Sequence, residues 1–280
     1  MRDLFGNILK NSYICTEFHV IILNIAIMAT KFKQILDSAP RDAILFSNWL
    51  TAQGLDIKAQ YAYTKSGWLE RMVKGVYKFK GSTPSLLSAV SSYNTQLEKK
   101  CIIGAYSALD IAGVSHYVAM GKPQMYLFTD NIHRLPVWML DMEWDYTVVY
   151  NTTSFLGDNM LGVEQITVAG KSILVSSRER AILECLYLPK AARSLLDIYY
   201  IMESLTSLRP DLLQDLLERC KSVKAKRLFL YMSEKANYPW FHSLDVSRIN
   251  LGTGRRMIVP TGKYIRKYNM TIPTELAEYE

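Results

Sequence analysis

Apolar residues recur at helical spacing in short segments near the N-terminus. One segment begins at Lys31, and a second covers residues 48–53. Ser47 is predicted to cap the second helix, because its hydroxyl can accept a hydrogen bond from the first turn, and Gly54 is predicted to follow its end. These segments predict two short helices joined by a glycine turn.

The next stretch, Leu55–Phe79, predicts a third helix and a β-hairpin. The Asp56 carboxylate can cap the free amides of the first turn, and Gly67 can take the left-handed conformation that ends a helix. The hairpin is predicted to turn near Lys74-Gly75. Its strand residues are Trp68-Leu69, Met72-Val73 and Val76-Tyr77-Lys78-Phe79. The order of helix, turn, helix and hairpin is that of a winged helix-turn-helix.

The third helix has two different faces when its residues are placed about 100° apart. The small or apolar side is predicted to comprise Leu55, Ala59, Ala62, Tyr63 and Ser66. The opposite side is predicted to expose hydrogen-bond donors, which a helix in a DNA major groove requires. These donors are Lys58, Gln60, Tyr61, Thr64 and Lys65. From the residues alone, an ordinary solvated helix explains this face equally well.

The rest of the chain predicts a larger mixed domain. Strands are predicted at 125–128, 145–150, 166–168 and 173–175, and helices at 83–97, 102–113, 195–205 and 225–237, with two more starting at Arg178 and Pro210. The fold class is therefore α+β, with an N-terminal winged helix-turn-helix followed by a larger mixed α/β domain with a helical C-terminal part. The predicted domains are residues 28–81 and 82–280.

Residues 1–27 are predicted to be an extension without a role in function. The apolar run Phe18–Ala29 is too short to cross a bilayer comfortably as a helix, and no small-residue cleavage site follows it. Met28 is the expected natural start. No membrane association is predicted.

The formal net charge of +7 favours an anionic partner without identifying it. The hairpin contributes Arg71, Lys74, Lys78 and Lys80 against the single acid Glu70, so it can contact a phosphate backbone. A basic run at residues 219–227 has an alternative role in neutralising helix C-termini. A second basic group can contact RNA or an acidic protein surface, and it comprises Arg255, Arg256, Lys263, Arg266 and Lys267.

Other motifs give little indication of a catalytic, metal-binding or phosphate-binding site. Gly170-Lys171-Ser172 lacks the first glycine of a phosphate-binding loop and lies in a predicted hairpin. Asp141, Glu143 and Asp145 would share one face of an alternating strand, where they could bind a metal or be simply solvated. The four cysteines are widely spaced and are predicted to be small buried hydrophobes. No catalytic residue, metal or cofactor is predicted.

Three segments, taken together, resemble the AbiEi-type antitoxins, which are transcriptional regulators of type IV toxin–antitoxin (abortive infection) systems. The first segment is K-S-G-W-L-E-R-M-V-K-G-V-Y, Lys65 to Tyr77. The second is V-S-S-R-E-R-A-I-L-E, Val175 to Glu184, and the third is N-L-G-T-G-R-R, Asn250 to Arg256. They occur in the family's order, and the resemblance covers most of Lys31 to Pro273.

The resemblance implies a cytoplasmic bacterial repressor that binds inverted repeats in its own promoter. It also implies that the chain counteracts a nucleotidyltransferase toxin encoded in the same operon, and it leaves direct contact with that toxin open. The expected surface for this antitoxin role is the group formed by Arg255, Arg256, Lys263, Arg266 and Lys267. Alternatives are a toxin-binding module without sequence-specific DNA binding, or a metal-dependent nucleotidyltransferase that uses the three acids near residue 143.

In the repressor interpretation, the Asp56–Ser66 helix enters the major groove. Gln60 is then expected to read a base, and the phosphate contacts are expected to set the salt dependence of binding. The residues expected to contact DNA are Lys58, Gln60, Tyr61, Thr64, Lys65, Arg71, Lys74 and Lys78.

Overall fold

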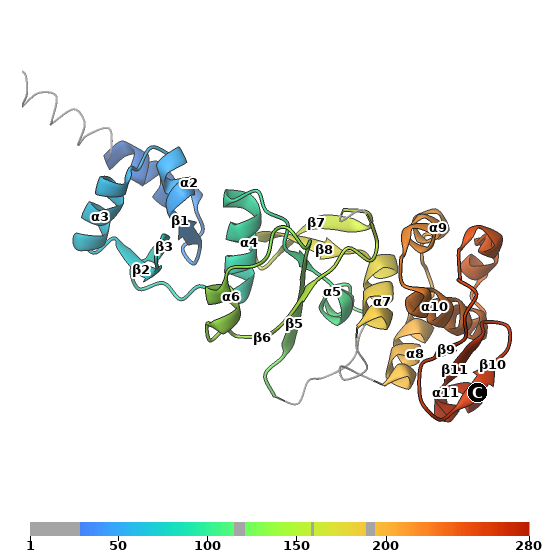
Figure 1. The fold of residues 1–280 in the computed structure, drawn as a ribbon. Coiled ribbons are helices and arrows are strands. Elements are labelled where there is room, and N and C mark those ends of the chain that lie inside the picture. The colour runs from blue at the N-terminus through green and yellow to red at the C-terminus, as the bar shows by residue number, and fades with distance from the viewer. Residues whose placement is uncertain (1–28, 115–120, 158–159, 189–193, 280) are drawn as a thin grey trace, which may run out of the picture. The chain divides into compact units, whose positions relative to one another are not determined.

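The computed structural model describes residues 29–114, 121–157, 160–188 and 194–279 (Figure 1). The chain divides into two compact units between Glu98 and Lys99. The sequence boundary near Gly81 falls earlier, before the last helix of the first unit. The predicted extension at residues 1–27 lies outside the described residues.

The first unit contains a helix over residues 29–38 and a small antiparallel sheet, coloured blue to cyan in Figure 1. Its strands pair in the order β1-β3-β2. The other elements are β1 (Ile44–Phe46), α2 (Ser47–Ala52), α3 (Ile57–Lys65), β2 (Leu69–Val73), β3 (Val76–Phe79) and α4 (Leu86–Gln96). One buried cluster draws on nearly all of them and contains Phe32, Ile35, Ala43, Leu45, Leu50, Leu55, Ala59, Leu69 and Phe79.

Helix α4 belongs to the first unit because its polar side chains bind the backbone of β1. Strand β1 is an edge strand, so one row of its backbone groups needs other partners. The Gln96 amide donates to Ile44 O (2.7 Å) and accepts from Phe46 N (3.0 Å). Ser92 Oγ accepts from Ile44 N at 3.2 Å. These bonds extend the unit past Gly81.

Gln60 connects α3 to α2 and to the turn between them. Its side chain has no solvent exposure. The Nε2 atom lies 2.8 Å from Leu55 O, 3.0 Å from Thr51 Oγ1 and 3.1 Å from Ser47 O. Its Oε1 atom accepts from Ser47 Oγ at 2.7 Å. Because every polar atom of this buried amide has a partner, its burial carries little desolvation cost.

The predicted cap of α3 is confirmed, whereas that of α2 is wrong. Asp56 Oδ1 accepts from Ala59 N at 2.7 Å, and Gly67 follows α3 with φ +78°. Ser47 is the first residue of α2 instead of its cap, and Phe46 occupies the cap position. The Ser47 hydroxyl is directed to Gln60, and its amide donates to Gly75 O at the hairpin turn.

The second unit begins with a mixed sheet of order β6-β5-β4-β8-β7. Its elements are β4 (Ile102–Ile103), α5 (Ala105–Ile111), β5 (Gln124–Thr129), α6 (Val137–Asp141), β6 (Thr147–Thr152), β7 (Val163–Val168) and β8 (Lys171–Ser176). Strands β4 and β8 run parallel, as do β5 and β6, and the other pairs are antiparallel. The predicted strands β5 to β8 are confirmed, and β7 and β8 form the predicted hairpin. The helix predicted over 102–113 is shorter, because Ile102–Ile103 form β4 and the helix α5 begins at Ala105.

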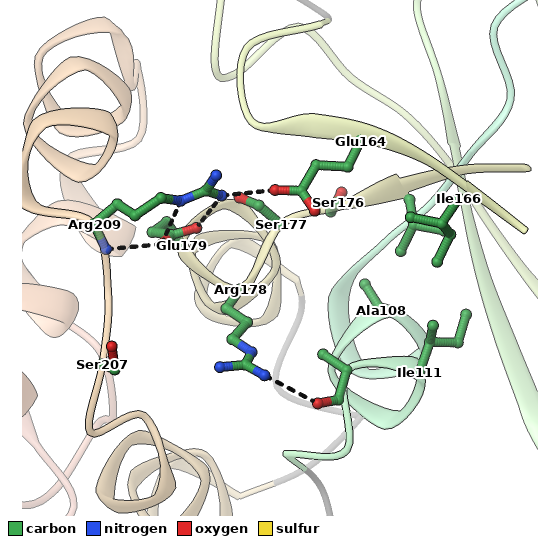
Figure 2. A pocket seen from close by; sticks show the side chains of 12 residues that line it. Ala108, Ile111, Glu164, Ile166, Ser176, Ser177, Arg178, Glu179, Ser207 and Arg209 are labelled. Carbon is green, nitrogen blue, oxygen red and sulfur yellow. Dashed lines mark hydrogen bonds and ion pairs between the residues drawn. The ribbon is translucent and has the colours of Figure 1, made fainter.

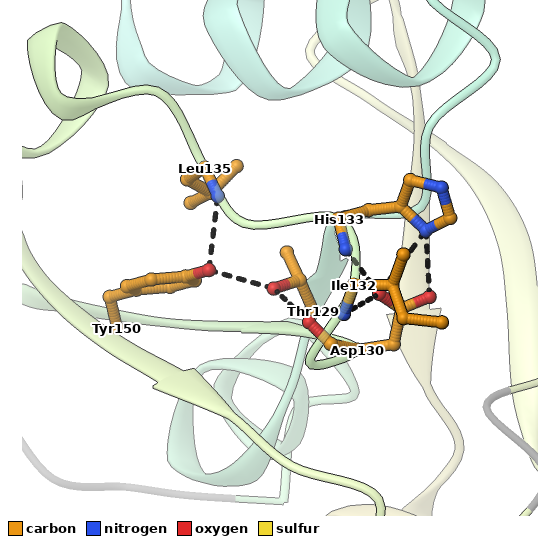
Figure 3. A network of polar contacts seen from close by, with 6 residues as sticks. All are labelled: Thr129, Asp130, Ile132, His133, Leu135 and Tyr150. Atoms are coloured by element: carbon orange, nitrogen blue, oxygen red, sulfur yellow. Dashed lines mark hydrogen bonds and ion pairs between the residues drawn. The ribbon is translucent and has the colours of Figure 1, made fainter.

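A polar network holds the connection between β5 and α6 (Figure 3). Asp130 Oδ1 accepts from the amides of Ile132 (2.9 Å) and His133 (2.6 Å), and the His133 ring adds a further bond. The hydrogen bond from His133 lowers the pKa of the Asp130 carboxyl. Tyr150 Oη bonds Thr129 Oγ1 (2.8 Å) and accepts from Leu135 N (3.0 Å), which ties β6 to this connection.

Further helices and a second sheet complete the described part of the unit, in yellow to red in Figure 1. The helices are α7 (Arg178–Tyr187), α8 (Leu195–Ser204), α9 (Pro210–Arg219) and α10 (Val223–Ala236), followed by 3₁₀ turns η1 (Pro239–Ser243) and η2 (Val246–Arg248). Strands β9 (Arg256–Met257), β10 (Lys263–Ile265) and β11 (Met270–Ile272) pair in the order β10-β11-β9, and α11 (Thr274–Glu278) follows. The helices predicted from Arg178 onward are confirmed, whereas the β9–β11 sheet was not predicted.

Helix α7 is the buried centre of this unit. It contacts α5, α8, α9 and α10. Within it, Glu184 has no exposure and accepts from Arg180 Nε (2.8 Å), Ser176 Oγ (3.0 Å) and Ala105 N (2.8 Å). Gly104 permits this approach, since a Cβ there would lie 2.3 Å from Glu184 Oε2.

No helix in the described part of the chain is long and apolar enough to cross a membrane. Cys101, Cys185 and Cys220 are buried, as predicted for small hydrophobes, and Cys15 lies outside the described residues. Burial raises the pKa of the Cys101 thiol.

We expect Gln60→Ala to destabilise the first unit by roughly 2–3 kcal/mol, because it leaves the buried Leu55 and Ser47 carbonyls without their partner. Hydrogen–deuterium exchange of the full chain should show faster exchange in α2 and α3 and unchanged exchange in α7. Gln53→Ala is the matched control, since Gln53 is exposed. Equal exchange in the two variants would contradict the structural role of Gln60.

Candidate functional site

The outer face of α3 is the main candidate for contact with a partner. It comprises Ile57, Lys58, Tyr61, Ala62 and Lys65, which are all exposed. Ile57 and Tyr61 expose 64% and 62% of their surface, which is high for large apolar side chains. Lys65 Nζ lies 5.6 Å from the centre of the Tyr61 ring. We call these five residues the α3 outer face.

Two predicted contact residues do not lie on this face. Gln60 was expected to read a base, and that assignment is wrong because its side chain is fully buried against α2. Thr64 is half-buried, and its hydroxyl donates to Gln60 O at 2.8 Å. Ala62 was assigned to the packing side and is exposed. The true exposed face is thus rotated about the helix axis from the predicted one.

The hairpin follows α3 directly, and β2 packs against that helix. Arg71 and Lys74 are exposed, and Lys74 stands at the turn beside Gly75, whose φ is +76°. Lys78 is less available, since its Nζ atom donates to Ser82 O at 3.0 Å and lies 3.5 Å from Glu70 Oε2. Of the predicted phosphate contacts on the hairpin, the structure leaves Arg71 and Lys74 open to solvent.

The predicted C-terminal basic group lies on and beside the β9–β11 sheet. All five of its cations are exposed. The Arg255 guanidinium lies 4.6 Å from the centre of the Tyr264 ring and donates to Thr271 Oγ1 at 3.0 Å, and Lys267 pairs with Glu234. We call Arg255, Arg256, Lys263, Arg266 and Lys267 the C-terminal basic surface.

Arg227 holds the loop that begins this surface. Its side chain is buried, and its guanidinium donates to Leu251 O, Gly252 O, Gly254 O and Asn269 O at 2.8–2.9 Å. Burial lowers the pKa of this guanidinium, and the nearby Arg256 lowers it further. Four carbonyl partners compensate for the desolvation of the cation. Two of the five cations in the basic run at residues 219–227 are therefore structural, since Lys226 is buried as well.

A pocket of about 410 Å³ opens beside the start of α7 (Figure 2). Arg209 crosses one side of it and donates to Glu179 (3.0 Å) and Glu164 (2.8 Å). Burial raises the pKa of Glu179, but the hydrogen bonds from Arg209 outweigh that effect and lower it. Arg178, on another wall, donates to Ala112 O at 3.3 Å. The carboxylates here are thus committed to Arg209.

The three acids near residue 143 do not share a strand face. Asp141 is the last residue of α6, and Glu143 and Asp145 lie in the connection before β6. The alternating-strand geometry that would have made them converge on a metal is therefore wrong. The physical reason is that Val137–Asp141 forms a helical turn around the buried Met139.

Two family models together match residues 28–273. A model described as the transcriptional regulator, AbiEi antitoxin, of type IV toxin–antitoxin systems matches residues 122–273. The model of the N-terminal domain of the same antitoxin matches residues 28–120. The chain belongs to the AbiEi antitoxin family. It is thus a member of a family of transcriptional regulators and antitoxins, as the sequence resemblance implied.

The AbiEi fold assignment agrees with one solved structure. The chain resembles the crystal structure of the RV2827C protein from Mycobacterium tuberculosis, with a TM-score of 0.56 and 13% sequence identity over 89% of this chain and 92% of that one. At this identity the likeness concerns the fold alone. No curated protein sequence matches this member of the AbiEi family.

The three AbiEi-like segments have different positions in the structure. Lys65 to Tyr77 covers the end of α3 and most of the hairpin, and Val175 to Glu184 covers the buried junction of β8 with α7. Asn250 to Arg256 is the loop that Arg227 binds. Sequence reasoning missed Arg227 and Glu184 as structural centres. Helical spacing offered one signal, because Glu184 follows Arg180 by four residues, the spacing that brings two side chains together on one helix face.

We expect Arg227→Lys to loosen the Asn250–Arg256 loop, because an ammonium cannot reproduce the planar fork that reaches four carbonyls. A loss of roughly 2 kcal/mol in stability is expected for the region, since buried carbonyls lose their donors. Hydrogen–deuterium exchange should rise at residues 250–256. Arg219→Lys is the matched control, as Arg219 is exposed at the end of α9. Unchanged exchange in Arg227→Lys would refute this role.

Proposed function

We propose that this chain is a DNA-binding repressor of its own operon and an antitoxin against a nucleotidyltransferase toxin. The observation that carries the first part is the α3 outer face, where Lys58 and Lys65 lie among exposed groups that no other part of the first unit covers among the described residues. Family membership supports the second part. The proposed DNA partner is an inverted repeat in the promoter, reached in the bacterial cytoplasm.

In the proposed complex, α3 lies in the major groove and the hairpin lies over the adjacent backbone. Lys58, Lys65, Arg71 and Lys74 supply the charge that neutralises phosphates, because all four are exposed. Lys78 contributes less, since Glu70 and Ser82 already engage it. Each phosphate contact is expected to contribute about −0.9 to the slope of log K against log salt.

The C-terminal basic surface supports the antitoxin role in this proposal. Arg256, Lys263 and Arg266 are exposed on a small sheet whose loop is held by Arg227. A fixed loop presents its charges in one arrangement, which favours a specific anionic partner over a diffuse one.

We expect the full chain to bind the DNA upstream of its own gene more tightly than scrambled DNA, with affinity that falls as salt rises. Lys74→Ala should weaken binding to both DNAs by a similar factor, because a phosphate contact carries no sequence information. Its salt slope should be smaller in magnitude by about 0.9. Fluorescence anisotropy at several salt concentrations measures both quantities.

Lys122→Ala is the control for that experiment, since Lys122 is an exposed lysine of the second unit. Equal effects of the two substitutions would remove the hairpin from the interface. Equal affinity of the wild-type chain for both DNAs would overturn the repressor proposal and favour a toxin-binding module without sequence-specific DNA binding.

We expect Arg256→Glu combined with Lys263→Glu to abolish protection against the co-expressed toxin and to leave operator selectivity in place. Both side chains are exposed, and both residues pair in the sheet through their backbones, which the substitutions leave in place, so the fold should be retained. Colony survival measures protection, and anisotropy measures operator binding. Lys122→Glu is the charge-matched control. Full protection by the double variant would place the antitoxin surface elsewhere.

A further inference from the structure

The α3 outer face has no amide side chain, the group that usually reads adenine by paired hydrogen bonds. Helix α3 is described in full, and its exposed residues include no asparagine, glutamine, arginine or acid. Adenine is typically read by an amide and guanine by arginine or lysine. The amide of this helix belongs to Gln60, which is buried and bonded to α2. Adenine readout by an amide of α3 is therefore not available.

This face also offers apolar surface on both sides of a line formed by Lys58 and Lys65, with Ile57 on one side and Ala62 on the other at about 100° per residue. Ile57 and Ala62 present methyl groups, and Tyr61 presents an aromatic ring with a hydroxyl. The only apolar group on the major-groove edge of a base pair is the C5-methyl of thymine. The lysines attract the phosphates that border the groove, and this attraction brings the apolar residues of the same face to the base edges.

We propose that the α3 outer face recognises thymine methyl groups in the operator. This inference rests on the proposed DNA-binding function. Ile57 and Ala62 are five residues apart, which is about 7.5 Å along a helix axis. The two residues also lie about 140° apart around the helix, so they are expected to contact different base pairs, and each half-site is inferred to carry two thymines.

The size of the effect follows from burial of a methyl group. Removing one buried methyl is worth about 0.8 kcal/mol, which corresponds to about a 4-fold change in affinity. Salt should leave this factor unchanged, because the contact is apolar. The lysine contacts behave in the opposite way, since they depend on salt and not on the methyl group.

The test replaces thymine by deoxyuridine, one position at a time, within the selected operator duplex. Deoxyuridine pairs like thymine and lacks only the methyl group. The full chain should lose about 4-fold in affinity at the contacted positions and nothing elsewhere. Ile57→Ala should bind thymine and deoxyuridine DNA equally at the position that Ile57 contacts. A cytosine–guanine pair at that position should weaken binding of the wild-type chain. Replacing that cytosine by 5-methylcytosine restores a methyl group and should recover part of the lost affinity.

Ile132→Ala is the matched control, because Ile132 is 84% exposed in the second unit. It should retain the wild-type response to deoxyuridine. Ile57 is exposed on α3, so Ile57→Ala should keep the fold, and an unchanged exchange pattern in α2 and α3 checks this.

The outcomes separate this inference from the function on which it rests. Selective operator binding with no response to deoxyuridine at any position would overturn methyl recognition and keep the repressor proposal. A wild-type chain that does not select the operator would overturn the repressor proposal itself. An Ile57→Ala variant that keeps the deoxyuridine response but changes the oligomeric state would also overturn the inference, because the face would then bind a second copy of this chain.

Discussion

The buried amide of Gln60 fixes the rotation of α3 about its own axis. Its partners are two backbone carbonyls and a hydroxyl on α2 and the following turn, and Ser47 Oγ donates to it in return. Neighbouring residues on a helix are about 100° apart around its axis. A rotation of α3 by even a fraction of that angle would move the Gln60 amide away from these groups and leave them without hydrogen bonds. The bonds of Gln60 thus determine that Ile57, Tyr61 and Ala62 face outward.

In the second unit a comparable role falls to the buried charges of α7. Glu184 joins the β4–α5 junction through Ala105 N, strand β8 through Ser176, and its own helix through Arg180. Such a cluster is costly unless every group is paired, so each member constrains the others. The segment Val175 to Glu184, which carries much of the family resemblance, therefore contributes architecture. The exposed basic residues that can meet a partner lie elsewhere, on the β9–β11 sheet.

The long periodic elements could be predicted from sequence, and the short ones could not. Helices such as α7 and α10 show several turns of apolar periodicity, whereas β1, β4 and β9 have three residues or fewer and show no period at all. Gln60 was misplaced for a different reason. A polar side chain on a short helix is expected outside, and its burial depends on acceptors from Ser47 and Thr51 whose positions are set by the tertiary fold. The prediction that the acids near residue 143 share one strand face failed because α6 interrupts the assumed strand.

The corrected face changes how affinity and specificity are divided in the proposed complex. Lys58, Lys65, Arg71 and Lys74 act through charge, which is strong at low salt and blind to sequence. Ile57 and Ala62 act through apolar contact, which is weak per group, selective for a methyl and insensitive to salt. If Gln60 had faced the groove, polar side chains would have provided both the affinity for DNA and the specificity for its sequence. With Gln60 inside, salt controls how tightly the chain binds DNA, and the apolar residues of the same helix control which DNA it selects.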